Sequence, residues 1–261
     1  MEELNEEQFQ RYARHLILDE VGEEGQARLL AARVLVVGAG GLGSPLLLYL
    51  AAAGVGTLGI VDSDTVDLTN LQRQIVHATP RIGALKTESA RETLAAINPG
   101  VRVETHPVRL GPDNAAALIG AYDLVADGSD NFATRYLLSD LCFRLQKPLV
   151  AGALSPFEGQ ISSFRPYLGA AHPCYRCLFR EPPPPGLVPR CETAGILGAV
   201  AGVIGTLQAV EVLKELLGLG DSLDGTLLIY DALGARFHRI RIGKDPECPT
   251  CGAEAFASAR P

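Results

Sequence analysis

The sequence lacks the excess of basic residues that most nucleic-acid-binding proteins carry. Its 261 residues include 23 lysines and arginines against 30 aspartates and glutamates, so the formal net charge is -7. Proteins that bind DNA or RNA usually present a positive surface to the phosphate backbone. The acidic balance therefore argues against nucleic acid as a partner.

The first ten residues also lack an apolar run, because four of them are glutamates. A secretory signal needs a continuous apolar segment. We therefore expect a cytoplasmic protein, and in that reducing compartment disulfides are disfavoured. Internal repeats and a low-complexity tail are missing as well, and the length fits one large α/β domain, residues 1–261.

Charge is absent from residues 34–61, a stretch long enough to raise the question of a membrane span. Seven glycines interrupt it in two clusters that would separate a strand, a helix and a second strand. Buried parallel strands also read as continuous apolar runs. A second uncharged stretch, 193–210, contains Gln208 and suits a buried helix. We therefore predict no membrane partner.

Strands and helices alternate in the predicted structure of residues 31–152. A strand at 33–37, a helix at 43–53 and a strand at 57–61 form one βαβ unit. A helix at 84–97, strands at 101–106 and 122–126, a helix at 131–146 and an extended segment at 149–150 follow. This order predicts a doubly wound, mostly parallel, Rossmann-like sheet.

The pattern changes after Gly152. Short alternating segments at 160–164, 227–230 and 237–242 predict late antiparallel strands. A helix is expected from about 194 to 217. One sheet with a modified end fits this pattern better than a detached second domain.

A glycine-rich loop joins the first predicted strand to the next helix. Gly38-Ala39-Gly40-Gly41-Leu42-Gly43 satisfies Gly-x-Gly-x-x-Gly, and Asp62 closes the following strand. Glycines let the backbone approach phosphates, the helix N-terminus supplies N–H donors, and a carboxylate accepts hydrogen bonds from ribose hydroxyls. The loop predicts a nucleotide site and leaves both NAD and ATP open.

Polar residues beyond the loop favour a triphosphate. They are Asp62 with Asp64, the run Asn70-Leu71-Gln72-Arg73-Gln74, Lys86, and Asp130 with Asn131. Splitting ATP between its α- and β-phosphates requires positive groups and a metal against the charge that develops on pyrophosphate. Arg73 and Lys86 could supply the charge, and Asp130 could bind Mg²⁺. Taken singly, each is equally well explained as an ordinary solvated residue.

Four of the six cysteines form two Cys-x-x-Cys pairs, Cys174 with Cys177 and Cys248 with Cys251. Two such knuckles can present four thiolates to one Zn²⁺. Four sulfur ligands leave no open position, so we predict a structural zinc site that ties the C-terminal segment to the middle of the chain. A redox dithiol and unrelated free thiols are the alternatives.

Cys191 is unpaired and precedes the predicted glycine-rich helix. The helix N-terminus and the adjacent Arg190 would lower its pKa, so it is a candidate nucleophile. An exposed loop cysteine without a function is the alternative.

In their order along the chain, these motifs resemble the ubiquitin-activating-enzyme-like adenylyltransferases, the ThiF/MoeB/HesA family. The resemblance covers nearly the whole chain. It implies a homodimer that uses ATP to adenylate the C-terminal glycine of a ubiquitin-like sulfur carrier, a MoaD- or ThiS-like protein ending in Gly-Gly. Such carriers serve molybdopterin, thiamine or thiolated-tRNA synthesis.

The resemblance also implies roles for single residues. Asp130 would take Mg²⁺, Arg14 would reach into the active site of the other subunit, and Cys191 matches a loop cysteine that receives the activated carrier in some relatives. The ATP site would be lined by Gly41, Asp62, Asn70, Arg73, Lys86 and Asp130. We expect N-terminal helices in residues 1–30, a nucleotide-binding part in 31–152 and a carrier-binding and zinc part in 153–261. The sulfur donor, such as a cysteine desulfurase or a rhodanese, is expected to be a separate protein.

Two other functions stay open. An NAD-dependent oxidoreductase would use the same glycine loop, and Arg73 with Lys86 argues against it only in combination. A non-catalytic scaffold could bind a ubiquitin-like protein without turnover, although the full set of nucleotide residues argues against that reading.

Overall fold

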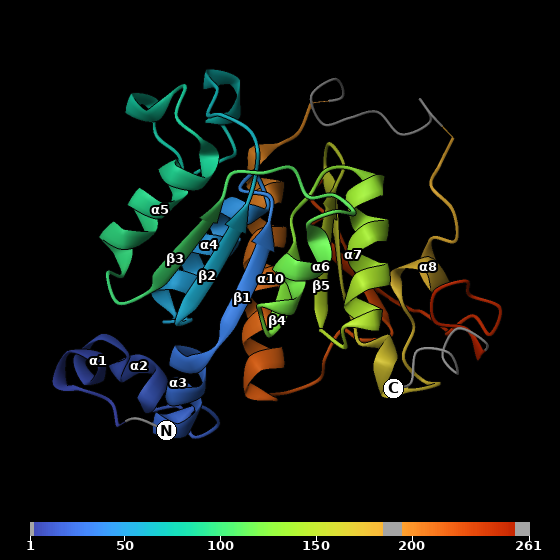
Figure 1. Cartoon of the computed structure of the whole chain (residues 1–261), viewed down its shortest axis with the longest axis horizontal. Helices are drawn as coiled ribbons and strands as arrows, with labels where there is room; N and C mark the ends of the chain where they lie inside the picture. The colour runs from blue at the N-terminus through green and yellow to red at the C-terminus, as the bar shows by residue number, and fades with distance from the viewer. Residues whose placement is uncertain (1–2, 185–194, 254–261) are drawn as a thin grey trace.

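The computed structural model describes residues 3–184 and 195–253. An eight-stranded sheet in the order β3-β2-β1-β4-β5-β6-β7-β8 lies at its centre (Figure 1). The first five strands in this order are parallel, and each later one is antiparallel to its neighbour. The predicted α/β class, with a mostly parallel sheet and antiparallel C-terminal strands, is confirmed. The strands are β1 (Arg33–Val37), β2 (Thr57–Val61), β3 (Arg102–His106), β4 (Leu124–Asp127), β5 (Leu149–Leu154), β6 (Glu158–Phe164), β7 (Thr226–Asp231) and β8 (Arg236–Arg241).

Helices cover both faces of the sheet (Figure 1). On one face, α4 (Gly43–Ala52), α5 (Lys86–Ile97) and α10 (Gly198–Leu217) share a core with Val34 and Val36 of β1. On the other, α6 (Ala115–Gly120) and α7 (Phe132–Arg144) share a core with Leu35 and Val37. Successive side chains of a strand point to opposite faces, so a strand buried on both sides is apolar throughout. This explains the lack of charge in residues 34–61.

The remaining helices lie outside these two layers. The N-terminal helices α1 (Glu6–Arg11), α2 (Ala13–Leu16) and α3 (Gly22–Ala31) lie near the amino ends of the parallel strands, at the lower left of Figure 1. The carboxyl ends of β1, β2 and β4 lie at the opposite end of the parallel strands. The short helices are η1 (Leu68–Asn70), η2 (Thr79–Arg81), η3 (Pro166–Leu168) and α8 (Tyr175–Leu178).

Two predicted elements have different limits in the structure. β5 extends to Leu154 because β6 pairs with it along its whole length, from Leu149 with Phe164 to Leu154 with Gly159. α10 begins at Gly198 instead of near 194, and Gly195, with φ of +73°, is in the left-handed region that a helix excludes. Within residues 3–184 and 195–253, no helix, α10 included, has the length and apolar content that crossing a bilayer requires.

Candidate functional site

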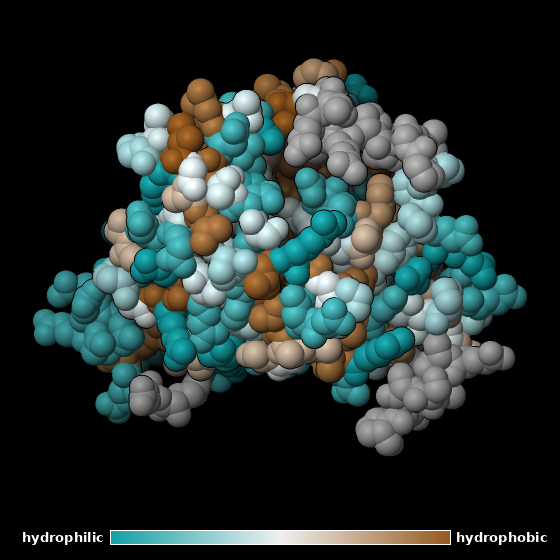
Figure 2. All heavy atoms as spheres, turned by 45° about the horizontal axis from the view of Figure 1, so that its top comes forward, coloured by the Kyte–Doolittle hydropathy of each residue, from teal (hydrophilic) through white to brown (hydrophobic). Residues whose placement is uncertain are grey.

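A cavity of about 1320 Å³ opens at the carboxyl ends of β1, β2 and β4 and continues over β5, β6 and β7. Figure 2 turns this side of the molecule toward the viewer and shows polar and apolar surface interspersed on it. The chain reverses its strand order between β1 and β4, and ligands of open α/β sheets bind beside such a point. The cavity brings together ten predicted site residues: Gly38, Gly40, Gly41, Asp62, Asp64, Asn70, Arg73, Lys86, Asp130 and Asn131.

Two glycines give the loop after β1 its shape. Gly38 has φ of +95°, in the left-handed region. A Cβ atom on Gly43 would lie 1.9 Å from the carbonyl oxygen of Gly38, so no other residue fits there. The loop therefore turns tightly and places the start of α4 directly behind the cavity.

Ala39, within the loop, is held from both sides of its backbone. Its N–H donates to Asp62 Oδ2 at 2.8 Å, and its carbonyl oxygen lies 2.9 Å from His77 Nε2. Asp62 Oδ1 also accepts from the N–H of Asp64 at 2.9 Å. Burial raises the pKa of Asp62, while the charge of Lys86 and the two N–H donors oppose this shift. Asp62 thus fixes the loop besides lining the cavity.

His77 supports the glycine loop from outside the cavity lining, and the sequence did not indicate this role. It is buried, and its Nδ1 lies 2.9 Å from Ser89 Oγ. Burial lowers its pKa to about 4, so the ring is neutral at pH 7. A carbonyl can only accept, so Nε2 carries the proton donated to Ala39. Its partners lie 12 and 38 residues away, and no local spacing could reveal them.

The pKa of His77 predicts a pH-dependent stability. Between pH 6.5 and about 4 the unfolded chain binds a proton that the folded chain refuses, so stability falls as the pH is lowered through this interval. From pH 7 to pH 5, the wild type will lose about 2 kcal/mol more unfolding free energy than His77→Gln. Urea unfolding at the two pH values measures this difference. Parallel losses in the two proteins would contradict the neutral, buried state of His77.

The two predicted cations approach the cavity from different elements, Lys86 from α5 and Arg73 from the loop beside Gly41 and the start of α10. Lys86, the first residue of α5, is buried and its Nζ lies 2.8 Å from Asp64 Oδ2. Arg73 donates from Nη1 to the carbonyl of Thr69 at 3.1 Å, and its side chain lies beside Gly41. Asp64, predicted to contact the nucleotide, therefore orients Lys86.

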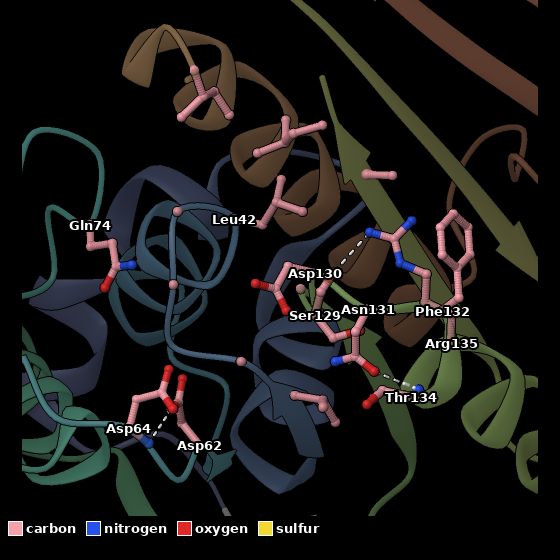
Figure 3. A pocket seen from close by; sticks show the side chains of 18 of the residues that line it. Leu42, Asp62, Asp64, Gln74, Ser129, Asp130, Asn131, Phe132, Thr134 and Arg135 are labelled. Carbon is pink, nitrogen blue, oxygen red and sulfur yellow. Dashed lines mark hydrogen bonds between the residues drawn. The ribbon is translucent and has the colours of Figure 1, made fainter. Parts of the chain in front are cut away.

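Asp130 and Asn131 occupy the middle of the cavity in the close view (Figure 3). The exposed side chain of Asp130 lines the cavity. Asn131 caps α7, because its Oδ1 accepts from the N–H of Thr134 at 2.9 Å. Arg135 of α7 lines the cavity as well and donates to the carbonyl of Ser129 at 2.8 Å. A single arginine on a helix resembles a solvated residue, so the sequence did not mark Arg135.

Four predicted site residues lie apart from this group. Gly43 begins α4 behind the loop, and Gln72 is exposed with its backbone close to Gly198; neither is among the lining residues. Arg14 belongs to α2, near the amino ends of the strands and away from the cavity of its own chain (Figure 1). Cys191 lies outside the described residues.

The two Cys-x-x-Cys pairs come together as predicted. The four Sγ atoms of Cys174, Cys177, Cys248 and Cys251 lie within 4.8 Å of one another. Three of the sulfur separations are 3.5, 3.5 and 3.9 Å. Zn–S bonds of about 2.3 Å give a tetrahedron with edges of about 3.8 Å. The residues therefore fit a zinc ion, and the N–H of Asp245 donates to Cys177 Sγ at 3.4 Å, as a second-layer partner would.

One acidic residue connects both knuckles to α7. Asp140 accepts two hydrogen bonds of 2.9 Å from Arg176, which lies inside the first pair. It also accepts from the hydroxyl of Thr250, which lies inside the second pair. The neighbouring Tyr175 extends from the first knuckle to the wall of the cavity. The cysteine cluster is thus connected to the wall of the cavity through α7 and α8.

Known proteins resemble the chain over most of its length. A model of the ThiF family matches residues 12–250. The sulfur carrier protein adenylyltransferase of Thermus thermophilus is 52% identical over 250 residues, which cover 95% of this chain and 92% of that protein. The SAMP-activating enzyme E1 of Haloferax volcanii is 50% identical, with 95% and 91% covered.

A solved structure supports the fold. The crystal structure of E. coli MccB with MccA-N7isoASN has a TM-score of 0.81, with 20% identity over 93% of this chain and 74% of that one. At this identity the likeness concerns the fold alone. The family match and the two half-identical relatives decide the assignment. The chain therefore belongs to the ThiF family, as the order of its motifs predicted.

Proposed function

We propose that this protein uses ATP to adenylate the C-terminal glycine carboxylate of a ubiquitin-like sulfur carrier that ends in Gly-Gly. The observation that carries the proposal is the gathering of Arg73, Lys86 and Asp130 around one glycine loop in one cavity. A hydride-transferring enzyme has little need of these charges beside a nucleotide. The name of the Thermus thermophilus relative, a sulfur carrier protein adenylyltransferase, supports the same activity.

In the proposed reaction a carboxylate oxygen of the carrier attacks the α-phosphorus of ATP. A P–O bond forms to the carrier, the bond from the α-phosphorus to the bridging oxygen breaks, and pyrophosphate leaves. No proton moves, because a carboxylate is already ionised at pH 7. Arg73 and Lys86 would hold the pyrophosphate, so positioning and charge supply the catalysis. Mg²⁺, for which Asp130 is the proposed ligand, would neutralise phosphate charge when bound.

We also propose that the protein acts as a cytoplasmic homodimer. The placement of Arg14 away from its own cavity suits a residue that serves a neighbouring subunit. We propose functional parts at 1–30, 31–152 and 153–261. The N-terminal helices, the glycine loop with the parallel strands, and the cysteine cluster support this division, and α3 and β5 extend one and two residues past its boundaries. Molybdopterin, thiamine and tRNA thiolation carriers are all candidate substrates, with a desulfurase or rhodanese as sulfur donor.

The test is the adenylation of purified carriers. With ATP and Mg²⁺, a carrier ending in Gly-Gly will gain the mass of AMP less one water, and pyrophosphate will be released in equal amount. The same carrier without its last glycine is the control and will stay unmodified. Binding of NAD in place of ATP, or an absence of adenylate on every carrier, would contradict the proposed function.

A further inference from the structure

Arg135 is a cation of the cavity that the proposed reaction leaves without a role. It donates from Nη2 to the carbonyl of Ser129 at 2.8 Å, next to Asp130. Its Nε is buried and makes no hydrogen bond of good geometry within the described residues, and the hydroxyl of Tyr175 is the polar group that lies near the guanidinium. The guanidinium carbon lies 5.9 Å from the centre of the Phe132 ring. The head group is thus held in place while part of its hydrogen-bonding capacity is unused.

A buried carboxyl group lies near Arg135 on the side away from the cavity. Asp127 is buried, with Oδ1 accepting from the N–H of Ser129 at 2.8 Å and Oδ2 unpartnered among the described residues. Burial raises the pKa of Asp127, and the positive charge of Arg135 opposes that shift. No hydrogen bond joins the two side chains in the described part of the chain. Arg135 therefore lies near a buried carboxyl group without forming an ion pair with it, and its own positive charge stays available to a ligand.

Arg135 lies on the opposite side of the cavity from Lys86. Figure 3 shows Asp62, Asp64 and Gln74 on one side, Arg135 and Phe132 on the other, and Asp130 between them. Lys86 is paired with Asp64 and so belongs to the first side. In a phosphoryl-group displacement the attacking and leaving oxygens lie roughly in line. If pyrophosphate leaves toward Lys86, the nucleophile enters from the side of Arg135.

The cavity beyond Arg135 suits an uncharged peptide tail. It passes over β5, β6 and β7, and apart from Glu158 its lining there is uncharged: Ala153, Leu154, Ser155, Gly159, Gln160 and Ile229. A Gly-Gly tail has no side chains, so its terminal carboxylate is the one charge by which its end can be recognised. Arg135 lies where this part of the cavity meets Asp130.

We propose that Arg135 binds the terminal carboxylate of the incoming tail and holds it in line with the α-phosphorus. This inference rests on the proposed adenylation of a carrier. A guanidinium presents paired N–H donors that match a carboxylate, and such charge-assisted bonds are stronger than neutral ones. Arg135 would also offset the repulsion between the anionic carboxylate and the phosphates.

The experiment compares a Gly-Gly carrier with the same carrier made as a C-terminal amide, which removes only the negative charge. Binding of each to the full-length protein with AMP present is measured by calorimetry for wild type, Arg135→Gln and Arg135→Lys. We expect wild type to bind the acid form about 10- to 100-fold more tightly than the amide form. Arg135→Gln should bind both forms equally, and Arg135→Lys should keep part of the preference.

Two controls separate a binding role from a structural one. Arg144→Gln removes an arginine from the exposed last turn of the same helix and should keep the full preference for the acid. The affinity for ATP without carrier, and the thermal unfolding midpoint, should be close to wild type in Arg135→Gln. If Arg135→Gln still binds the acid more tightly than the amide, the proposal is overturned. It is also overturned if this variant loses as much affinity for ATP as for the acid form of the carrier. Preferential binding of the acid without any transfer of AMP would instead overturn the proposed function alone.

Discussion

Lys86→Met will lower carrier-dependent ATP–pyrophosphate exchange by about 10²- to 10³-fold, the usual cost of losing one preorganised charge-stabilising group. Lys86 is buried beside two carboxylates, Asp62 and Asp64, and its Nζ lies 2.8 Å from the second. Removing the ammonium leaves these acids facing the triphosphate and takes away a positive charge near the leaving pyrophosphate. Both changes raise the barrier. The exchange of labelled pyrophosphate into ATP measures the effect directly.

The same helix supplies a control. Arg91 of α5 is paired with Glu88 at 2.8 Å and exposed to solvent, so Arg91→Met should alter the exchange by less than about twofold. Lys86→Arg keeps the charge and should retain more activity than Lys86→Met. If Lys86→Met exchanged pyrophosphate at the wild-type rate, the cations would not stabilise the leaving group, and the proposed adenylation would lose its physical basis.

We expect the cysteine cluster to hold Zn²⁺, and Cys251→Ser to abolish its binding and lower the unfolding free energy by more than about 3 kcal/mol. Structural zinc contributes about 10 to 16 kcal/mol of apparent binding energy in small zinc peptides. Here the four sulfurs join segments more than 70 residues apart, and Cys251 is fully buried. Without the ion, the C-terminal knuckle loses its anchor to α8. Metal analysis and urea unfolding of protein purified without chelator measure the two effects.

Among the described residues, the buried thiol outside the cluster provides the comparison. Cys142 lies in the core between α7 and the sheet, so Cys142→Ala should cost some stability through lost packing and keep the zinc. Wild-type protein without zinc, or a Cys251→Ser protein that unfolds like wild type, would show that the cluster is not a structural metal site.

The two metal knuckles illustrate what local spacing can predict. Two Cys-x-x-Cys pairs are informative because the geometry of zinc–thiolate bonding limits how four sulfurs can be arranged. The glycine loop is similar, since the close approach of Gly43 to Gly38 requires glycine in any chain that turns there. These signals depend on residues close together in the sequence, and the structure agrees with them.

The positions of Asp140 and Arg135 illustrate what local spacing cannot predict. Asp140 is an ordinary helix residue until the fold brings Arg176 and Thr250, 36 and 110 residues away, to its carboxylate. The candidate role of Arg135 depends on its neighbours in the fold, which are Asp127, Asp130 and the face of β5. Single charged residues carry no periodic signal, so their neighbours become known only with the fold.

The amino-acid sequence alone determined the alternation of strands and helices, the glycine loop, the cysteine cluster and the family, because each depends on a residue pattern that backbone or metal geometry demands. The tertiary structure alone decided the pairing of Lys86 with Asp64, the support of Ala39 by His77, and the placement of Arg135 opposite Lys86. These arrangements join residues distant along the chain, and they exist only once the layers have packed.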